Sequence, residues 1–103
     1  MDVTDDSFAD VVLGSPVPVI VDFWAPWCRP CEAVDRHLQA IAEGHGDRVR
    51  LVRMNVDENV GVPSRYGVLS LPTVILVARG ETCVTVFGAH ARSHYERAFA
   101  PHI

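Results

Sequence analysis

Two cysteines stand three residues apart in the segment Cys28-Arg29-Pro30-Cys31. Apolar residues at helical spacing continue from Cys31, so we expect both cysteines in the first turn of a helix, with their sulfurs on one side. The free N–H groups and positive dipole of a helix N-terminus stabilise a thiolate, which is the species that attacks a disulfide. Pro30 suits this turn because helices leave donors free there. The pair therefore predicts reversible dithiol/disulfide chemistry.

The position of each cysteine predicts its role. Cys28 is nearer the exposed end of the helix and is expected to attack a substrate disulfide. Cys31, one turn further in, is then expected to resolve the mixed disulfide. A disulfide that closes so short a loop gains little from loop entropy and should be cycled easily.

A zinc site and a purely structural bridge are the alternatives for this pair. Zinc would need two further ligands, but there is no second Cys-x-x-Cys, and Cys83 is distant and alone. His90 and His94 have a spacing that could hold a metal, although surface histidines are far more common. We therefore expect no metal site. A structural bridge is disfavoured because the sequence indicates a reducing compartment.

Asp22 is a third residue of chemical interest, because it interrupts the apolar run from Val17 to Trp24. A charged carboxylate is costly to bury in such a strand, so burial should raise the pKa of Asp22. One interpretation is structural, with Asp22 paired to a backbone donor or to Arg53. The other is a chemical role.

The elements that must position these residues follow from the spacing of apolar side chains. We expect four helices. The first carries Phe8, Val11 and Val12, and the second runs from Cys28 to Ala42. The third is capped by residues 57–59 and ends near Gly67, and the last turns inward the residues Ala91, Tyr95, Ala98 and Phe99. Strands are expected over 17–24, 49–56, 73–78 and 82–87. The first strand is apolar on both faces and should be central. A crossover and a terminal hairpin predict a mixed sheet with helices on both faces.

Composition sets the remaining limits. The chain has 103 residues and is 49% hydrophobic, which fits one domain, residues 1–103, with its own core. The formal charge is −4 and no basic run occurs, so no nucleic-acid partner is expected. The apolar stretches fall far short of the ~20 residues that span a bilayer, and the acidic start is unlike a signal peptide. We expect a cytoplasmic protein that does not engage a membrane.

The segment from Val21 to Cys31 closely resembles the active-site segment of the thioredoxin family. The resemblance continues in residues 54–59, in Tyr66-Gly67-Val68, in Leu71-Pro72-Thr73, and in Gly80 and Gly88, so that it covers essentially the whole chain. It implies an α/β thioredoxin fold. A central mixed β-sheet, made of a short N-terminal edge strand at about residues 1–3 plus four strands, would be flanked by four helices.

The resemblance also implies roles for further residues. Pro72 would be cis and lie beside the disulfide, against the alternative of an ordinary trans proline that opens a strand. Asp22 would accept the proton of Cys31 during resolution, and we favour this over the structural interpretation. Trp24 would pack beneath the site. The residues expected to contact a substrate peptide are Trp27, Arg29, Pro30, Leu71, Pro72 and Gly88, with Phe87 beside them.

The chain departs from the family pattern at several positions. Arg29 replaces the usual glycine; its charge should favour the Cys28 thiolate and make the couple more oxidising than about −270 mV, unless it points into water. Glu32 opposes that charge and could pair with Arg36, which stands in place of a kink proline. The helix should therefore run straighter. Cys83 is expected to be a buried inert thiol, with a regulatory or dimer-forming thiol as the alternative.

The activity implied by the resemblance is reduction of protein disulfides. No bound cofactor is expected, because electrons would come from NADPH through a flavin-dependent thioredoxin reductase. Disulfide-containing proteins would be the other partners, and a monomer is expected. Two alternatives remain open: a specialised oxidant or isomerase, suggested by Arg29, and a non-catalytic peptide-binding module that uses the Trp27–Leu71 surface.

Overall fold

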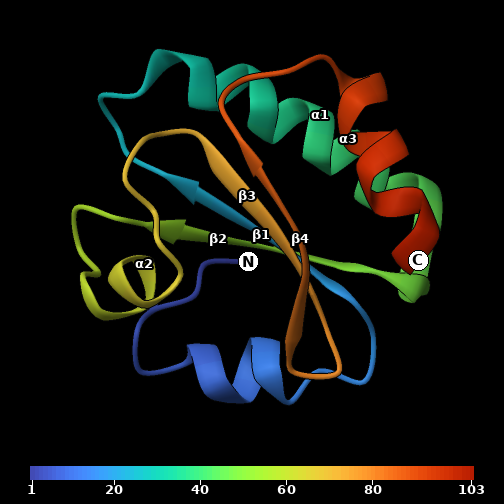
Figure 1. Cartoon of the computed structure of the whole chain (residues 1–103), viewed down its shortest axis with the longest axis horizontal. Helices are drawn as coiled ribbons and strands as arrows, with labels where there is room; N and C mark the ends of the chain where they lie inside the picture. Colours follow the sequence, from blue (N-terminus) through green and yellow to red (C-terminus); the bar gives the residue numbers. More distant parts are fainter.

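A four-stranded sheet in the order β2-β1-β3-β4 forms the centre of the computed structural model, which describes all residues from 1 to 103 (Figure 1). Strand β1 (Val19–Trp24) runs parallel to β2 (Arg50–Asn55) and antiparallel to β3 (Thr73–Ala78). Strand β4 (Glu81–Phe87) pairs antiparallel with β3. The predicted mixed sheet with a central first strand is confirmed.

Helices cover both faces of this sheet, and the alternation of side chains along β1 divides the core between them. Val19, Val21 and Phe23 face η1 (Ala9–Leu13) and α2 (Gly61–Arg65). The other face packs against α1 (Arg29–His45) and α3 (Arg92–Phe99). Figure 1 shows α1 and α3 together, with α2 and the N-terminal turn on the other side. Asp22 has the same parity as Ile20 and so faces α1 and α3.

The sheet ends at the N-terminus in a single bridge rather than a strand. Asp2 pairs with Arg53, where the Val3 N–H donates to the Arg53 carbonyl and the Arg53 N–H donates to the Met1 carbonyl, both at 2.8 Å. Four strands are therefore as predicted, and the expected edge strand is reduced to one pair of hydrogen bonds.

Helix α1 matches its prediction closely. Its buried face carries Cys31, Val34, Leu38 and Ile41, it begins directly after Cys28, and it continues without a break to His45. Gly46 follows with φ of 59°, a conformation that favours glycine and ends the helix.

The start of α2 corrects the prediction that residues 57–59 cap this helix. The Asp5 carboxylate, from the N-terminal segment, accepts hydrogen bonds from the N–H groups of Val60, Gly61 and Val62 at 3.1, 2.9 and 2.8 Å. Asn59 instead accepts the Asp5 N–H at 2.8 Å. The cap therefore comes from a distant segment, and these backbone bonds, the one from Val62 most of all, lower the pKa of Asp5.

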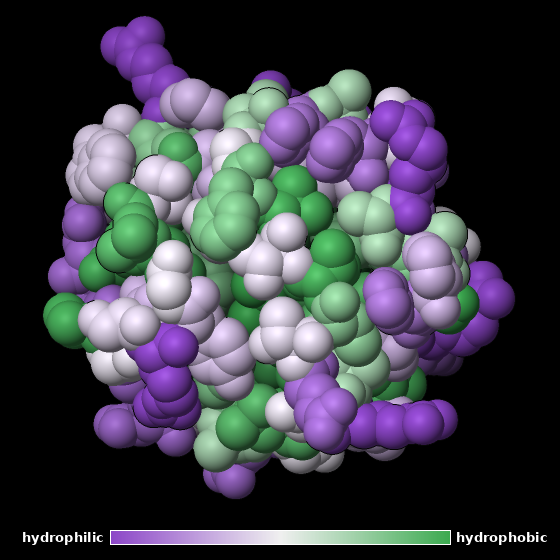
Figure 2. All heavy atoms as spheres, viewed as in Figure 1, coloured by the Kyte–Doolittle hydropathy of each residue, from purple (hydrophilic) through white to green (hydrophobic).

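Two details of the C-terminal helix and the surface complete the fold. Tyr95 and Phe99 are buried and Ala98 is half-buried as expected, but Ala91 is exposed because it precedes α3. On the face shown in Figure 2, hydrophobic residues lie mainly over the middle and the most hydrophilic ones mainly around the edge.

None of the helices is both long enough and apolar enough to cross a membrane.

Candidate active site

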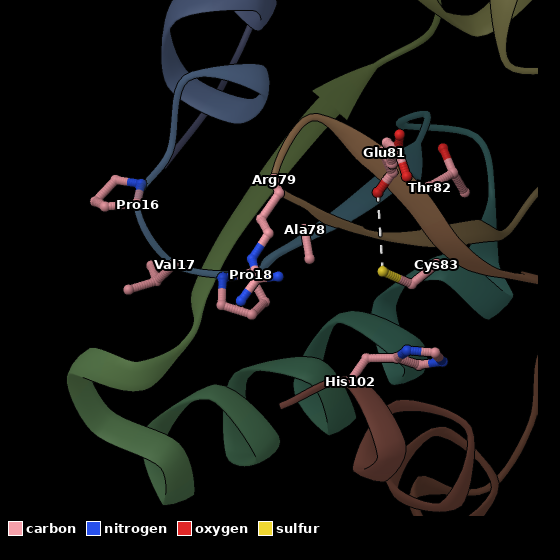
Figure 3. A pocket seen from close by; sticks show the side chains of 9 residues that line it. All are labelled: Pro16, Val17, Pro18, Ala78, Arg79, Glu81, Thr82, Cys83 and His102. Carbon is pink, nitrogen blue, oxygen red and sulfur yellow. Dashed lines mark hydrogen bonds between the residues drawn. The ribbon is translucent and has the colours of Figure 1, made fainter.

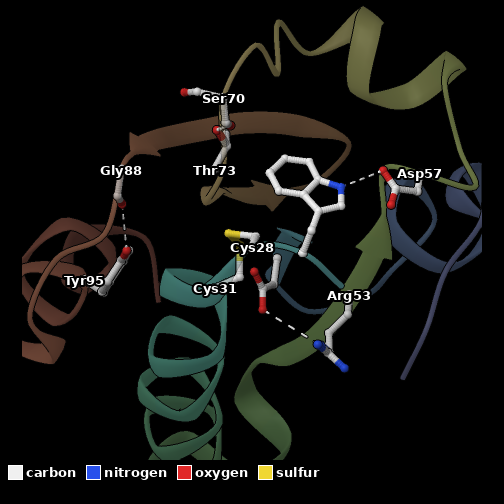
Figure 4. Close-up of a disulfide and its surroundings, with 10 residues drawn as sticks. Cys28, Cys31, Arg53, Asp57, Ser70, Thr73, Gly88 and Tyr95 are labelled. Atoms are coloured by element: carbon white, nitrogen blue, oxygen red, sulfur yellow. Dashed lines mark hydrogen bonds and ion pairs between the residues drawn. A yellow bond between two sulfur atoms is a disulfide. The ribbon is translucent and has the colours of Figure 1, made fainter. Parts of the chain in front are cut away.

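Cys28 and Cys31 form a disulfide at the N-terminus of α1, with their Cα atoms 5.4 Å apart (Figure 4). Cys28 has an extended backbone and stands at the N-cap position, and Pro30 is in the first turn, as the sequence predicts. Both cysteines are almost buried, with 5% and 3% of their surface exposed. The exposed fraction therefore hardly distinguishes the two cysteines, whereas their positions along the helix distinguish them clearly.

The segment before β3 lies beside the disulfide and is tied to the end of β4. The Leu71–Pro72 peptide bond is cis, as expected. The Pro72 carbonyl accepts the N–H of Gly88 at 2.9 Å, and the Thr73 hydroxyl donates to the Ser70 carbonyl at 2.7 Å. Figure 4 shows Ser70, Thr73 and Gly88 around the sulfurs. Pro72 itself is buried, and its role as a substrate contact stays a prediction.

Leu71 is half-buried against the small cluster that contains both cysteines, and it makes no backbone hydrogen bond. Its N–H and C=O groups are therefore available to a partner. An extended peptide can pair with free backbone groups in the way that a strand joins a sheet edge. The role of Leu71 as a substrate contact, which the family resemblance implies, stays a prediction.

An apolar groove of about 160 Å³ adjoins this segment; it is lined by Trp27, Val56, Val68, Leu69, Ser70 and Leu71. Trp27 is 67% exposed, and its indole N–H donates to the Asp57 carboxylate at 3.1 Å, which fixes the ring at the rim. Leu69 is 96% exposed, and the sequence analysis missed it. Its apolar neighbours Val68 and Leu71 were the available signal.

The other residues expected at the substrate-contacting surface lie outside this groove. Arg29, Pro30 and Phe87 are exposed and Gly88 is half-buried. None of them lines the groove. Arg29 and Glu32 form no ion pair, and the predicted contact between Glu32 and Arg36 is absent.

Asp22 lies with no exposed surface beneath this site, and neither of its carboxylate oxygens has a hydrogen-bond partner. Burial, followed by the neighbouring carboxyl group of Asp35, raises the pKa of Asp22 to about 8, although Arg53 acts in the opposite direction. The upward shift of the Asp22 pKa agrees with the expectation from the sequence. Asp22 is therefore largely protonated at neutral pH. It ionises, and so becomes able to accept a proton, at a pH only slightly above neutral.

Arg53 contacts both carboxylates from β2. Its Nε is 4.0 Å from Asp22 Oδ2 and 3.1 Å from Asp35 Oδ1, so the expected pairing with Asp22 exists but is the weaker contact. Its guanidinium carbon lies 4.2 Å from the centroid of the half-buried Trp24 ring, a cation–π geometry. Trp24 thus packs beneath the site, as expected, and also holds Arg53.

Asp35 is the functional candidate that the sequence analysis missed. It follows Cys31 by four residues and so lies one turn further along the same face of α1. That spacing was the signal that could have found it. Its side chain is only 13% exposed.

Cys83 and the histidines lie away from this site. Cys83 is half-buried rather than buried, its thiol is 3.8 Å from the Glu81 carbonyl, and it lines a pocket of about 560 Å³ near His102 (Figure 3). His90 precedes α3 and stacks on His94 with ring centroids 4.0 Å apart.

The two histidines of helix α1, His37 and His45, are half-buried. No group of three or more His, Cys, Asp or Glu side chains is placed to hold a metal ion.

A disulfide between two cysteines at a helix N-terminus, beside a cis proline and an apolar groove, defines a thiol–disulfide oxidoreductase. The thioredoxin family model matches residues 1–100, and the chain belongs to the thioredoxin family. Its redox group is the Cys28–Cys31 disulfide.

Individual relatives support the same assignment. The chain is similar to thioredoxin 1 of Synechococcus elongatus, with 42% identity over 98% of this chain and 94% of the relative. It is 44% identical to a thioredoxin of Rickettsia bellii over 88% of this chain and 87% of the relative. It is 46% identical to a chloroplastic M-type thioredoxin of Chlamydomonas reinhardtii over 84% of this chain, which corresponds to only 62% of that relative's length.

Proposed function

We propose that this protein reduces disulfides in other proteins by cycling between the Cys28–Cys31 dithiol and the disulfide. The observation that carries the proposal is the disulfide at the start of α1, directly beside the unpaired backbone of Leu71. A substrate strand paired with Leu71 would be held next to the Cys28 sulfur. Alignment of this kind lowers the entropic part of the barrier to exchange.

Cys28 is the proposed nucleophile. Its thiolate attacks one sulfur of the substrate disulfide, a mixed disulfide forms, and the other substrate sulfur leaves as a thiolate that takes a proton from water. Cys31 then gives up its proton, and its thiolate attacks the Cys28 sulfur. The second substrate sulfur leaves as a thiolate that takes a proton from water, and Cys28–Cys31 is oxidised, so two electrons have passed to the substrate.

Asp22 is the proposed acceptor of the Cys31 proton. It is buried on the sheet face that packs against α1, whose buried face begins with Cys31. A pKa of about 8 keeps this carboxyl close to the pH at which a thiol loses its proton. Matched proton affinities favour transfer in both directions, which a reversible couple needs.

The groove from Trp27 to Leu71 is the proposed docking surface for the substrate. Its walls are mostly apolar, and the exposed Leu69 and Trp27 project at its edge. Exposed apolar patches of this kind mark interaction sites.

We further propose a monomeric, cytoplasmic protein of one domain that is reduced again by a flavin- and NADPH-dependent thioredoxin reductase. Family membership supports this partner. Replacing dithiothreitol by a purified reductase and NADPH in an insulin-reduction assay tests it.

The proposal predicts different outcomes for the two cysteine variants. With insulin as the substrate and dithiothreitol as the electron source, Cys28→Ser should be inactive. Cys31→Ser should accumulate a stable mixed disulfide with insulin through Cys28, because the resolving thiol is missing. Non-reducing electrophoresis and mass spectrometry would measure the adduct, and Cys83→Ser is the control that should behave like the unchanged protein.

Two outcomes would oppose the proposal. Activity in Cys28→Ser would show that another group performs the exchange. Equal, stable binding of a partner by the oxidised and reduced forms, without turnover, would favour the peptide-binding module instead.

A further inference from the structure

Asp22 can take a proton from Cys31 only after it has given up its own, and the surroundings of Asp22 restrict the path of that proton. Asp22 is 0% exposed, and both of its oxygens lack a hydrogen-bond partner. It is also largely protonated at neutral pH, so it can accept another proton only if it passes on its own. A proton acceptor in this state needs a second group that connects it to solvent.

Asp35 is held in the position that such a group requires. Its Oδ2 accepts a hydrogen bond from the Gln39 side-chain amide at 2.7 Å, and its Oδ1 is 3.1 Å from Arg53 Nε. The same Arg53 Nε lies 4.0 Å from Asp22 Oδ2, so one guanidinium holds the two carboxyl groups side by side, and the Asp35 side chain is 13% exposed. Asp35 therefore lies next to the buried acid on one side and reaches solvent on the other.

The charges around the pair favour one shared proton. When Asp22 carries a proton, Asp35 and Arg53 balance each other; when both acids are ionised, one negative charge is left in a buried site. Two close carboxylates titrate as a coupled pair for this reason. The other groups that face Asp22 supply no further cation: α1 contributes Cys31, α3 contributes the neutral Tyr95, and the paired residue of β3 is Val74.

Solvent reaches the cluster at its outer side. A pocket of about 290 Å³ is lined by Trp24, Ala25, Pro26, Cys28, Cys31, Glu32 and Arg53. The pocket thus joins the disulfide to the guanidinium that contacts both carboxylates.

We propose that Asp35 carries protons between Asp22 and solvent, so that Asp22 and Asp35 share one proton beside Arg53 and act as a relay during disulfide exchange. This inference rests on the proposed role of Asp22. The Cys31 thiol gives its proton to Asp22, Asp22 passes its own proton to Asp35, and Asp35 releases one to water. One proton enters and one leaves, and the Cys31 thiolate remains to attack Cys28.

The test compares Asp35→Asn, Asp35→Glu, Asp22→Asn and Glu43→Gln. Glu43 is the matched control, because it is an exposed carboxylate on the same helix with no ion pair or hydrogen bond. Two quantities are measured: the pH at which the Asp22 carboxyl titrates, by carbon-13 NMR, and the rate of insulin reduction as a function of pH and of formate concentration.

The relay predicts changes in both quantities for Asp35→Asn. The Asp22 pKa should fall, because the like charge of Asp35 that raises it is removed, but it should stay above 3.8 because burial remains. The reduction rate should fall by about tenfold, less than the ~10²–10⁴ typical of a direct acid–base catalyst. Formate, as a small proton carrier, should restore much of that rate, and Asp35→Glu should stay close to the unchanged protein. A residue that only stabilises α1 would show no formate rescue.

The outcomes separate the relay from the role of Asp22. If Asp35→Asn matches Glu43→Gln in titration and rate while Asp22→Asn is slow, the relay is wrong and the role of Asp22 stands. If Asp22→Asn is itself unchanged across the pH range, both ideas fall. A slow Asp35→Asn that formate does not rescue also overturns the relay.

Discussion

Asp22 shows at the scale of one residue how chemistry and stability oppose each other. A buried carboxyl whose pKa is about 8 in the folded protein and 3.8 as an ordinary group binds a proton more tightly when the chain is folded. Between these two values, rising pH removes a proton from the unfolded state's acid first, so the folded state loses stability. Above about pH 8 the loss is complete and constant.

Replacing Asp22 by asparagine should therefore stabilise the oxidised protein, and more so at high pH. The advantage of Asp22→Asn over the unchanged protein is expected to grow by roughly 2–4 kcal/mol between about pH 5 and about pH 9. Urea unfolding at the two pH values measures this. A difference in unfolding free energy that stays the same at both would mean that Asp22 does not titrate in this range.

Arg29 is the residue that could shift the balance of the Cys28–Cys31 couple between reduction and oxidation of a substrate. It is exposed in the first turn of α1 and forms no ion pair, so its field on Cys28 is screened by solvent. A surface charge at a helix end contributes about 0.3–1 kcal/mol, which for two electrons corresponds to roughly 6–20 mV.

Arg29→Gly should consequently lower the reduction potential of the couple by no more than roughly 20 mV. Equilibration with glutathione, followed by thiol alkylation and mass spectrometry, measures the shift. Arg36→Gln on the same helix is the control and should leave the potential unchanged. A fall much larger than this would show that Arg29 acts on the thiolate at close range.

At the scale of the elements, the N-terminal segment organises a helix more than 50 residues away. The Asp5 carboxylate holds three backbone N–H groups at the start of α2, and Asn59 holds the Asp5 N–H in return. Helix α2 has no side-chain cap of its own. The helix and the loop after it lead to the groove beside Leu71, so this cap also supports the docking surface.

Asp5→Ala should lower the melting temperature, because three N–H groups lose their acceptor, while Asp6→Ala should change it little since Asp6 is exposed and makes no hydrogen bond. The Asp5 pKa is depressed, so its contribution is present above the ordinary pKa of 3.8 and disappears as the pH falls through the folded value. Melting curves at neutral and acidic pH compare the two variants. Equal melting temperatures for both at neutral pH would contradict the proposed importance of the cap.

The elements themselves could be predicted because each has a strong local pattern. The two apolar faces of β1 mark a central strand, and the spacing from Cys31 to Ile41 marks the buried face of α1. The cap of α2 could not be predicted in this way, since Asp57 and Glu58 stand where a local cap would be and nothing in the sequence near Asp5 points to residue 60. Long-range side-chain contacts leave no periodic signal.

The residues of the candidate site also fall into two groups, those marked by a local sequence pattern and those placed by long-range contacts. Cys28, Cys31 and Asp22 were identified because a motif or an out-of-place polar residue marks them. Asp35 was missed because an acidic residue beside the apolar stripe of a helix is usually a solvated one, and only the position of Arg53 on β2 draws it inward. The predicted pair of Glu32 and Arg36 failed because spacing alone does not stabilise two exposed side chains enough to hold them together.

At the scale of the whole molecule, the two cores place the reactive group. One core lies between the sheet and the N-terminal segment with α2, and the other lies between the sheet and α1 with α3. Because β1 is paired on both sides, its C-terminal end carries the cysteine segment out between β2 and β3. The disulfide therefore sits where α1, the Leu71 segment and the Asp22 cluster meet.

The reduction potential of the Cys28–Cys31 couple tests the account most directly, because it decides whether this molecule donates electrons to protein disulfides. Equilibration of the unchanged protein with glutathione should give a value between about −270 and −200 mV, slightly more oxidising than the ordinary thioredoxin value but still that of a reductant. A value near about −120 mV, typical of a strong disulfide oxidant, would contradict the proposed reductase.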